Sequence, residues 1–255
     1  MLFISGCSQS QTPSASTTPA PATSESAAPV AEAPAAPSPD AATITGKVSF
    51  QGAAPSMKTV SMSKESSCDS AHKAKPQHEE TVVVNPNKTL RYVFVYVKSG
   101  ANAANAAPPA PLTLDQKTCW YTPHLLGVMV GQTINVVNSD SGVLHNIHFM
   151  PKSNPPLNFG QPGPAPGATP PSRSVVFHKA EIIPVKCDVH SWMHAVVAVS
   201  DNPYFGVTDE TGNFKITGLP PGSYTLTAWH EKYGTQDIQV KVGKKEKKTV
   251  NFTLK

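Results

Sequence analysis

Two short segments of the chain concentrate side chains that bind metal ions. The first is CDVHSWMH, in which Cys187, His190 and Met193 follow one another at three-residue intervals. A thiolate, an imidazole and a thioether at this spacing can close around one ion when they lie on a tight loop between strands. The second is LHNIHF, whose His145 and His148 offer a further imidazole from a neighbouring loop. Together they predict a mononuclear metal site.

The donor types select the metal. Sulfur ligands favour Cu(I), imidazole suits both oxidation states of copper, and two histidines, one cysteine and a weak axial methionine are the ligand set of blue copper sites. Zinc also binds cysteine and histidine, but methionine is a poor zinc ligand. A multicopper oxidase or nitrite reductase would need paired His-x-His or His-Cys-His motifs, and a dinuclear centre would need two cysteines on one loop. The sequence has neither, so we expect one mononuclear copper per chain and no enzyme.

From about Pro111 to Ser200 the sequence resembles the cupredoxins, and within them the amicyanin type most closely. It shares the Cys, His and Met spacing of CDVHSWMH and the upstream motif His-Asn-x-His-Phe. It also shares a stretch from Tyr121 that leads into a hairpin bounded by Gly131. The resemblance implies a Greek-key β-sandwich that carries single electrons.

The same resemblance assigns roles to residues. It implies His145, Cys187, His190 and Met193 as the copper ligands. Asn146 would lie behind them and tie the two ligand loops together, and groups of this kind fix ring orientation and tune the potential. The favoured function is therefore an electron carrier that exchanges electrons with redox proteins, of the cytochrome or dehydrogenase type, through an exposed ring of His190.

The sequence departs from the cupredoxin pattern beside the cysteine. Asp188 stands where the family usually has a small hydroxyl residue, Val189 replaces a proline, and Lys186 replaces an aromatic residue or histidine. Asp188 is thus a second residue expected behind the ligands. An acidic neighbour should stabilise Cu(II) and lower the reduction potential.

The other histidines have weaker claims on a metal. His148 and His194 flank the site, either as substitute ligands and electron relays or as ordinary hydrogen-bonding groups. For His124 and His230, in the segments YTPH and WHEKYG, we expect packed or hydrogen-bonded positions.

The C-terminal part resembles a second family, the carboxypeptidase regulatory-like, transthyretin-like β-sandwich. The resemblance rests on a TD-x-x-G-x-F hairpin at 208–214 and an L-P-P-G-x-Y turn at 219–224. Gly212 and Gly222 suit positive φ, and the two prolines stiffen the approach to the turn. Such sandwiches are usually scaffolds or adhesive modules. A rival function is therefore a non-redox surface module, with the metal structural, stored for delivery or unused.

The order of the segments predicts the domain organisation. Strands of the kind that open the regulatory-like sandwich, at 46–50 and 93–97, precede the cupredoxin-like stretch. We therefore predict a discontinuous sandwich of residues 43–104 and 201–255, interrupted by a cupredoxin domain at 105–200. Two sequential domains are the alternative.

Short alternating or apolar runs bounded by Gly, Pro, Asn and Asp predict an all-β fold from residue 43 onward. The predicted strands are 43–50, 81–84, 90–97, 125–130, 133–138, 174–178 and 194–199. Gly131 and Gln132 should turn a hairpin, 151–171 should form a long loop, and no amphipathic helix is expected.

Composition and charge limit the fold class and the kinds of binding partner that we expect. Charged residues are only 15% of the 255, and 26 prolines are about double the usual share, which suits β-rich domains with long loops. The net charge of +4 is small, and much of it comes from four lysines in 244–248. We interpret this run as a solvated hairpin turn, with a patch that binds anions or a membrane as the alternative. Without a basic stripe interleaved with aromatic residues, nucleic acid is not an expected partner.

The N-terminus predicts export. The residues before Cys7 are similar to the processing signal of bacterial lipoproteins, in which that cysteine is lipidated. Residues 1–7 are too short for a secretory signal, so either the start codon lies further upstream or the match is accidental. Residues 8–42 are almost entirely Pro, Ala, Ser and Thr and cannot bury enough apolar surface to fold. We expect a tether between a membrane anchor and a periplasmic or cell-surface domain.

The four cysteines divide by context. Cys7 belongs to the N-terminal signal and Cys187 to the metal motif, which leaves Cys68 and Cys119. In an oxidising compartment this pair can form a disulfide, and closing a loop of about 50 residues would stabilise the fold by about 4 kcal/mol on the chain-entropy model. Two unpaired buried thiols are the alternative.

Overall fold

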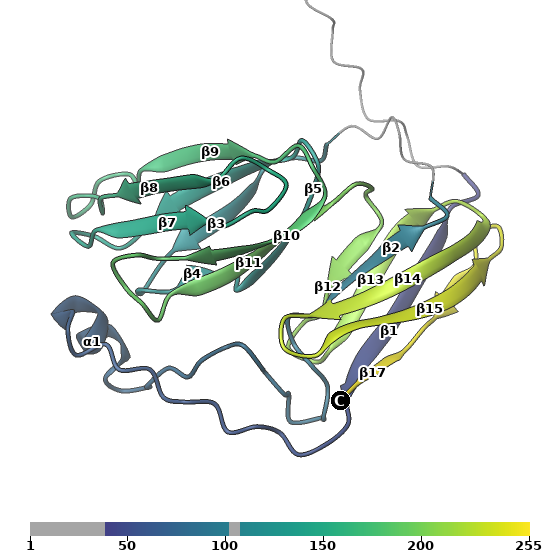
Figure 1. The fold of residues 1–255 in the computed structure, drawn as a ribbon, viewed down its shortest axis with the longest axis horizontal. Helices are drawn as coiled ribbons and strands as arrows, with labels where there is room; N and C mark the ends of the chain where they lie inside the picture. Colours follow the sequence, from purple (N-terminus) through teal and green to yellow (C-terminus); the bar gives the residue numbers. More distant parts are fainter. Residues whose placement is uncertain (1–38, 102–107) are drawn as a thin grey trace, which may run out of the picture. The chain divides into compact units, whose positions relative to one another are not determined.

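The computed structural model describes residues 39–101 and 108–255. Apart from the helix α1 (Ser66–His72), the regular structure in these ranges consists of β-strands, which confirms the predicted all-β class (Figure 1). Cys7 and residues 8–38 of the predicted tether lie outside the described ranges. Residues 39–42 of the predicted tether are described, and there the prediction is wrong at its end. Ala42 is the first residue of a strand and is fully buried. No helix in the described part of the chain is long and apolar enough to cross a membrane.

One β-sandwich is built from the middle of the chain. Its strands are β3 (Leu112–Gln116), β4 (Tyr121–Thr122), β5 (Leu125–Met129), β6 (Thr133–Asn138), β7 (His145–Phe149), β8 (Leu157–Gln161), β9 (Ser172–Val176), β10 (Glu181–Lys186) and β11 (His194–Ser200). One sheet has the order β5-β11-β10-β7-β8 and the other β4-β3-β6-β9. β5 runs parallel to β11 and β3 parallel to β6, while the other neighbours are antiparallel.

The core of this sandwich follows from alternation along its strands. In β6 every second residue is buried, as a strand with one face on the core requires. Ile147 of β7, Ile183 of β10 and Val197 of β11 are fully buried in the same cluster. That cluster also contains Cys187 and Met193, so two of the predicted ligands belong to the core.

The second sandwich combines segments from both sides of the first. Its strands are β1 (Ala42–Phe50), β2 (Phe94–Ser99), β12 (Phe205–Val207), β13 (Asn213–Leu219), β14 (Gly222–His230), β15 (Gly234–Val242), β16 (Lys247–Thr249) and β17 (Phe252–Leu254). β1 pairs with β13, β16 and β17, and β2 lies between β12 and β14. Both sheets thus join a strand that precedes the first sandwich to strands that follow it, around one apolar core.

An apolar cluster connects the two sandwiches. It contains Phe94 of β2, Leu125 of β5, and Val196 and Ala198 of β11, all buried. Phe205 of β12 packs against the same cluster and lies 5.4 Å from Phe94, measured between ring centroids. Side chains of one sandwich are therefore partly buried by the other.

Several predicted elements are wrong in detail. Residues 81–84 form no strand, and only an isolated bridge joins Val84 to Leu90. β2 begins at Phe94, not at Leu90, because Tyr92 has a φ of 61° and interrupts the extended backbone. The predicted loop 151–171 contains β8, which extends the sheet beyond β7.

Two predicted turns also differ. Gly131 does turn the chain, with a φ of 79°, but β5 and β6 belong to different sheets, so the turn is a corner of the sandwich and not a hairpin. The positive φ predicted for Gly222 occurs instead at Gly218, whereas Gly212 has the predicted positive φ. In the lysine run, Lys244 and Lys245 lie in the turn from β15 to β16, whereas Lys247 and Lys248 belong to β16. Because β15 and β16 belong to different sheets, this turn is not the predicted hairpin.

The unexpected helix α1 belongs to a segment pinned against the first sandwich. A disulfide joins Cys68 of the helix to Cys119, with a Cα–Cα distance of 5.6 Å. Around it Met62 and Val143 are buried, and Trp192 packs against the same cluster. Seven residues are too few to show helical periodicity, which is why sequence analysis missed the helix.

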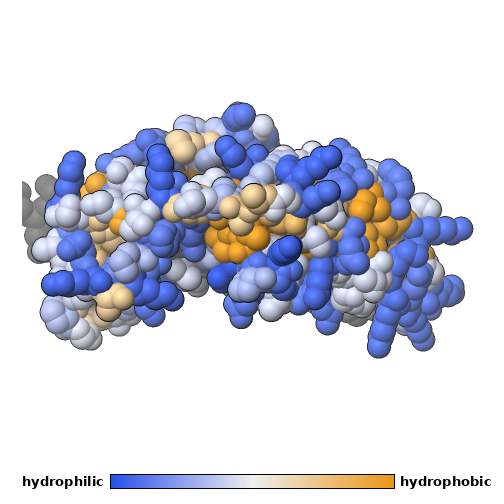
Figure 2. Space-filling model, turned by 90° about the horizontal axis from the view of Figure 1, so that it is seen from below, coloured by the Kyte–Doolittle hydropathy of each residue, from blue (hydrophilic) through white to orange (hydrophobic). Residues whose placement is uncertain are grey.

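The face drawn in Figure 2 is largely hydrophilic, with hydrophobic residues gathered in a few patches. Large apolar side chains more than a third exposed among the described residues are Leu112, Leu144, Met150, Val176 and Val189.

The disulfide makes a measurable prediction. Replacing Cys68 and Cys119 together by alanine should lower the free energy of unfolding by about 4 kcal/mol, because the 51-residue separation then adds its full loop entropy to the unfolded chain. Urea unfolding followed by tryptophan fluorescence measures the difference. The unchanged protein treated with a thiol reductant should lose a similar amount, and equal stability of variant and parent would contradict this account.

Candidate metal centre

The sheet positions the four predicted ligands at one end of the first sandwich. His145 is the first residue of β7, Cys187 directly follows β10, and Met193 directly precedes β11. The loop between β10 and β11 is closed by backbone hydrogen bonds from Cys187 N–H to the carbonyl of Met193 (3.1 Å) and from Met193 N–H to the carbonyl of His190 (2.9 Å). All four residues are at most 3% exposed.

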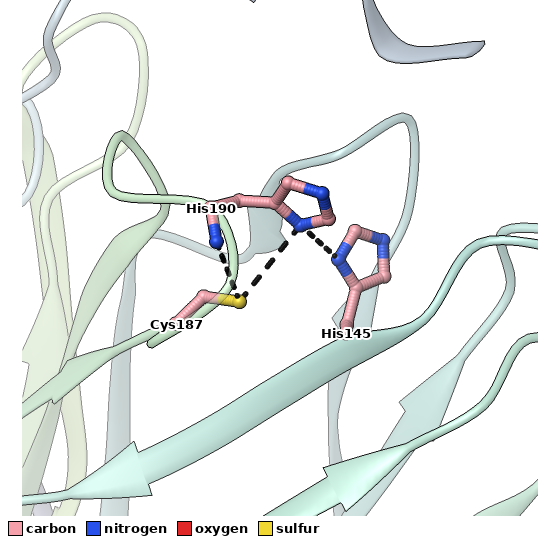
Figure 3. Close-up of side chains that lie close together, drawn as sticks. All are labelled: His145, Cys187 and His190. Atoms are coloured by element: carbon pink, nitrogen blue, oxygen red, sulfur yellow. Dashed lines mark hydrogen bonds between the residues drawn. The ribbon is translucent and has the colours of Figure 1, made fainter. Parts of the chain in front are cut away.

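Three of these side chains point their donor atoms at one another (Figure 3). His145 Nδ1 lies 3.0 Å from His190 Nδ1, which lies 3.9 Å from Cys187 Sγ. Ligands bound at about 2.0–2.3 Å in a trigonal plane are separated by about 3.5–3.8 Å. The two imidazoles and the thiol therefore fit a single metal ion with little rearrangement. Met193 is buried in the same cluster as Cys187.

The environment of Cys187 favours the metal-binding thiolate. Its Sγ accepts backbone N–H groups from Asn146 (3.4 Å) and His190 (3.3 Å). Burial acts to raise the pKa of Cys187, but the hydrogen bonds that the sulfur accepts outweigh burial and lower that pKa below its ordinary value. The thiolate is the form that binds metals, so the surroundings of this sulfur are compatible with metal binding.

Asp140 supports His145 from the far side of the ring and was not anticipated from the sequence. Its Oδ2 accepts a hydrogen bond from His145 Nε2 at 2.7 Å, and its carboxylate also accepts the N–H groups of Thr118 and Cys119. Burial acts to raise the pKa of Asp140, but these hydrogen bonds hold it below its ordinary value. Because the proton of His145 then sits on Nε2, Nδ1 keeps its lone pair toward the site.

Asn146 links β7, which carries His145, to the loop that carries Cys187. Its side-chain Oδ1 accepts the N–H of Asp188 at 3.0 Å, while its own backbone N–H donates to Cys187 Sγ. Its Nδ2 donates to Asn158 of β8 at 2.7 Å. Asn146 thus holds the loop that carries Cys187 against β7.

The negative charge of the Asp188 carboxylate is compensated by neighbouring side chains. It pairs with Lys186 Nζ at 2.9 Å and with His148 Nδ1 at 3.1 Å, and it accepts Asn158 Nδ2 at 3.0 Å. These contacts, with Lys186 first and His148 next, lower the pKa of Asp188 to about 2. The compensation reduces the effect that a lone acidic neighbour would have on the ligand sulfur. The same ion pair holds His148 against Asp188, outside the cluster of His145, Cys187 and His190.

The exposed ring predicted for His190 is wrong, because that residue is only 3% exposed. The ring of Trp192 packs on it with a centroid distance of 5.0 Å, and Trp192 Nε1 donates to the carbonyl of Cys119 at 3.1 Å. Trp192 in turn contacts the cluster around Met62 and the disulfide. The segment around Met62 and Cys68, which is distant in sequence, therefore packs against the loop that carries His190. His230, by contrast, is buried and hydrogen-bonded as expected.

The fold and site thus define an all-β protein with a buried cluster of two histidines and one cysteine that can hold a metal ion. A family model of the carboxypeptidase regulatory-like domain matches residues 193–255, which confirms the resemblance of the C-terminal part. The match begins at Met193, directly before β11 of the first sandwich, and continues through β11 and β12 to β17. No curated protein sequence matches the chain.

Solved structures similar to the chain include cupredoxins and a copper-containing nitrite reductase. A methionine-to-alanine mutant of amicyanin in its Cu(I) form is 21% identical, with a TM-score of 0.30 over 42% of this chain and 98% of that one. The purple cupredoxin from Nitrosopumilus maritimus is 24% identical, with a TM-score of 0.28 over 36% and 100%. The copper-containing nitrite reductase from Thermus scotoductus is 22% identical, with a TM-score of 0.30 over 40% and 25%.

The contact between Asp140 and His145 predicts a loss of metal affinity. Asp140→Asn should weaken copper binding by about 10–100-fold, because a neutral amide no longer fixes the proton of His145 on Nε2. Competition with a chelator of known affinity measures the change. Asp188→Asn is the matched control and should change affinity much less, since the Asp188 carboxylate binds Lys186, His148 and Asn158 and not one of the four predicted ligands. Equal affinities for the Asp140→Asn variant and the parent would contradict the assigned role.

Proposed function

We propose that the protein is an exported electron carrier that binds one type 1 copper ion per chain through His145, Cys187, His190 and Met193. The observation that carries this proposal is the convergence of two buried imidazole nitrogens and a buried thiol sulfur. The thiolate and the thioether suit Cu(I), and the imidazoles suit Cu(II) as well. Copper bound there would supply a centre that gains or loses one electron.

The residues around the proposed ligands provide the rigidity and the exclusion of water that an electron carrier needs. Asp140 and the backbone N–H groups of Asn146 and His190 hold ligand atoms in fixed positions, so little has to move when the charge changes. Burial of the ligands excludes water and lowers the local dielectric. Trp192 adds to that exclusion by packing over His190.

The apolar surface near the ligands supports docking of redox proteins. Leu144 and Val189 are each about half exposed, at 51% and 53%, and each directly precedes a ligand in the chain. Since the His190 ring itself is covered, we propose that partners of the cytochrome or dehydrogenase type approach over these two residues. We propose neither an enzyme activity nor binding to nucleic acid.

The proposed location is the periplasm or the cell surface, with lipidated Cys7 as the anchor. The disulfide between Cys68 and Cys119 supports export, because such bonds persist in oxidising compartments. In the proposed organisation, residues 43–104 and 201–255 form a discontinuous regulatory-like sandwich and 105–200 the copper domain. Pairing of β1 with β13 and of β2 with β14 supports that division.

A second candidate function is copper storage or a structural metal in a surface module. The burial of His190 favours it, because a carrier usually needs a ligand edge near the surface and a store does not. The two functions differ in what happens on reduction. A carrier keeps its copper and passes the electron on, whereas a store has no need of fast, reversible cycling.

Redox cycling of the copper-loaded chain tests the proposed carrier. We expect a reversible one-electron titration without loss of copper, followed by absorption. Met193→Leu should shift the potential measurably, since the axial ligand tunes it. Met150→Leu, at a partly exposed methionine in the same sandwich, should leave it unchanged. Release of copper on reduction would contradict the carrier and favour storage, and an unchanged potential in Met193→Leu would contradict the axial role of Met193.

A further inference from the structure

A second cluster of potential metal ligands lies apart from the one already described. It consists of His124, which directly precedes β5, His194, the first residue of β11, and Glu231, which directly follows β14. One donor atom from each lies within 4.8 Å of the others. We propose that these three side chains bind a second metal ion, a divalent ion of the zinc type. The proposal does not depend on copper binding at the first site.

His194 presents a nitrogen that lacks a partner. Its Nδ1 lies 3.2 Å from the carbonyl oxygen of Trp192, which can only accept, so Nδ1 carries the proton. Nε2 of the neutral ring then holds a bare lone pair, and this atom is buried without a hydrogen bond. Most buried polar atoms in proteins are paired, and an exception points to a missing ion or water. A metal ion at this position would satisfy Nε2.

The ring of His124 lies between two carboxylates, one facing each nitrogen. The residue is 2% exposed, and its Nε2 lies 2.6 Å from Glu231 Oε1. The other nitrogen, Nδ1, faces Glu80 Oε2 at 3.8 Å, beyond hydrogen-bond distance, and is buried without a hydrogen bond, like Nε2 of His194. Glu80 is itself held by hydrogen bonds from Tyr92 Oη and Trp120 Nε1. If Nε2 binds a metal, the proton of the neutral ring lies on Nδ1, on the side of the ring that faces Glu80. A hydrogen bond from that N–H to a carboxylate is what orients metal-binding rings, and a small approach of Glu80 would form it.

The donor set indicates which metal would bind. Two neutral imidazoles and one carboxylate are the protein ligands of several zinc sites, in which a water completes the tetrahedron. The cluster contains no sulfur, so it lacks the preference of the first site for Cu(I). The bound cation would compensate the negative charge of Glu231.

The proposed ion would also act on the architecture. His124 and His194 belong to the first sandwich, and Glu231 belongs to the turn between β14 and β15 of the second. An ion held by all three would cross-link the two sandwiches beside their apolar contact. His194 is the chain neighbour of Met193, so the two sites would be joined by a single peptide bond.

Zinc titration of the full chain tests the second site. Cys187→Ala removes the thiolate of the first site and serves as the background. Isothermal titration calorimetry of this metal-free variant with Zn²⁺ should give one equivalent. Adding Glu231→Gln should weaken binding at least tenfold. Adding Glu210→Gln, at a side chain that is 78% exposed and outside the cluster, should leave affinity unchanged.

A second substitution separates a ligand role from a folding defect. His124→Gln in the same background should also abolish or weaken zinc binding, while circular dichroism stays that of the parent. The alternative is an ordinary ion pair between His124 and Glu231. Absence of zinc binding in the background variant, or binding that neither Glu231→Gln nor His124→Gln weakens, would overturn the proposal.

Discussion

The pairing of β10 with β11 is the constraint on which the site depends. The two strands are in register up to Lys186 opposite His194, and the loop beyond is closed by the hydrogen bond from Cys187 N–H to the carbonyl of Met193. β7 pairs with the other side of β10, which brings His145 beside that loop. Three segments of one sheet therefore fix the proposed ligands, and the sandwich core behind them keeps Cys187 and Met193 buried.

A second constraint comes from the segment between β1 and β2. It has little regular structure of its own apart from α1, and the disulfide at Cys68 and Cys119 holds it against the loop that carries His190. Trp192 connects the two, since it packs on His190 and donates to the carbonyl of Cys119. The same contacts that keep water from the ligands also cover the ring expected to be the point of electron exchange. Stability of the ligand environment and access to it are therefore opposed in this fold.

Sequence analysis succeeded where the signal is local. Cys187, His190 and Met193 lie within seven residues, so their common loop could be inferred from spacing alone, and alternation placed strands such as 133–138 correctly. It failed where partners are distant or unpatterned. The role of Asp140 depends on the fold of the turn before β7, and neither the exposed ring of His190 nor the strand at 81–84 survives in the structure.

The cluster of His124, His194 and Glu231 illustrates the same limit. His124 and Glu231 are separated by 107 residues and come from different sandwiches. Neither has a neighbour at a spacing typical of metal ligands, so the sequence favoured packed histidines. Only the tertiary structure reveals that a buried nitrogen of His194 has no partner there.

The central claim is that Cys187 is the thiolate ligand of one copper ion. Its most direct test is a copper titration of the reduced, metal-free protein followed by visible absorption and electron spin resonance, with Cys187→Ser as the control. The account predicts an intense thiolate-to-copper absorption band that saturates at one equivalent and is lost in the variant. Absence of that band, or copper binding that is indifferent to Cys187, would contradict it.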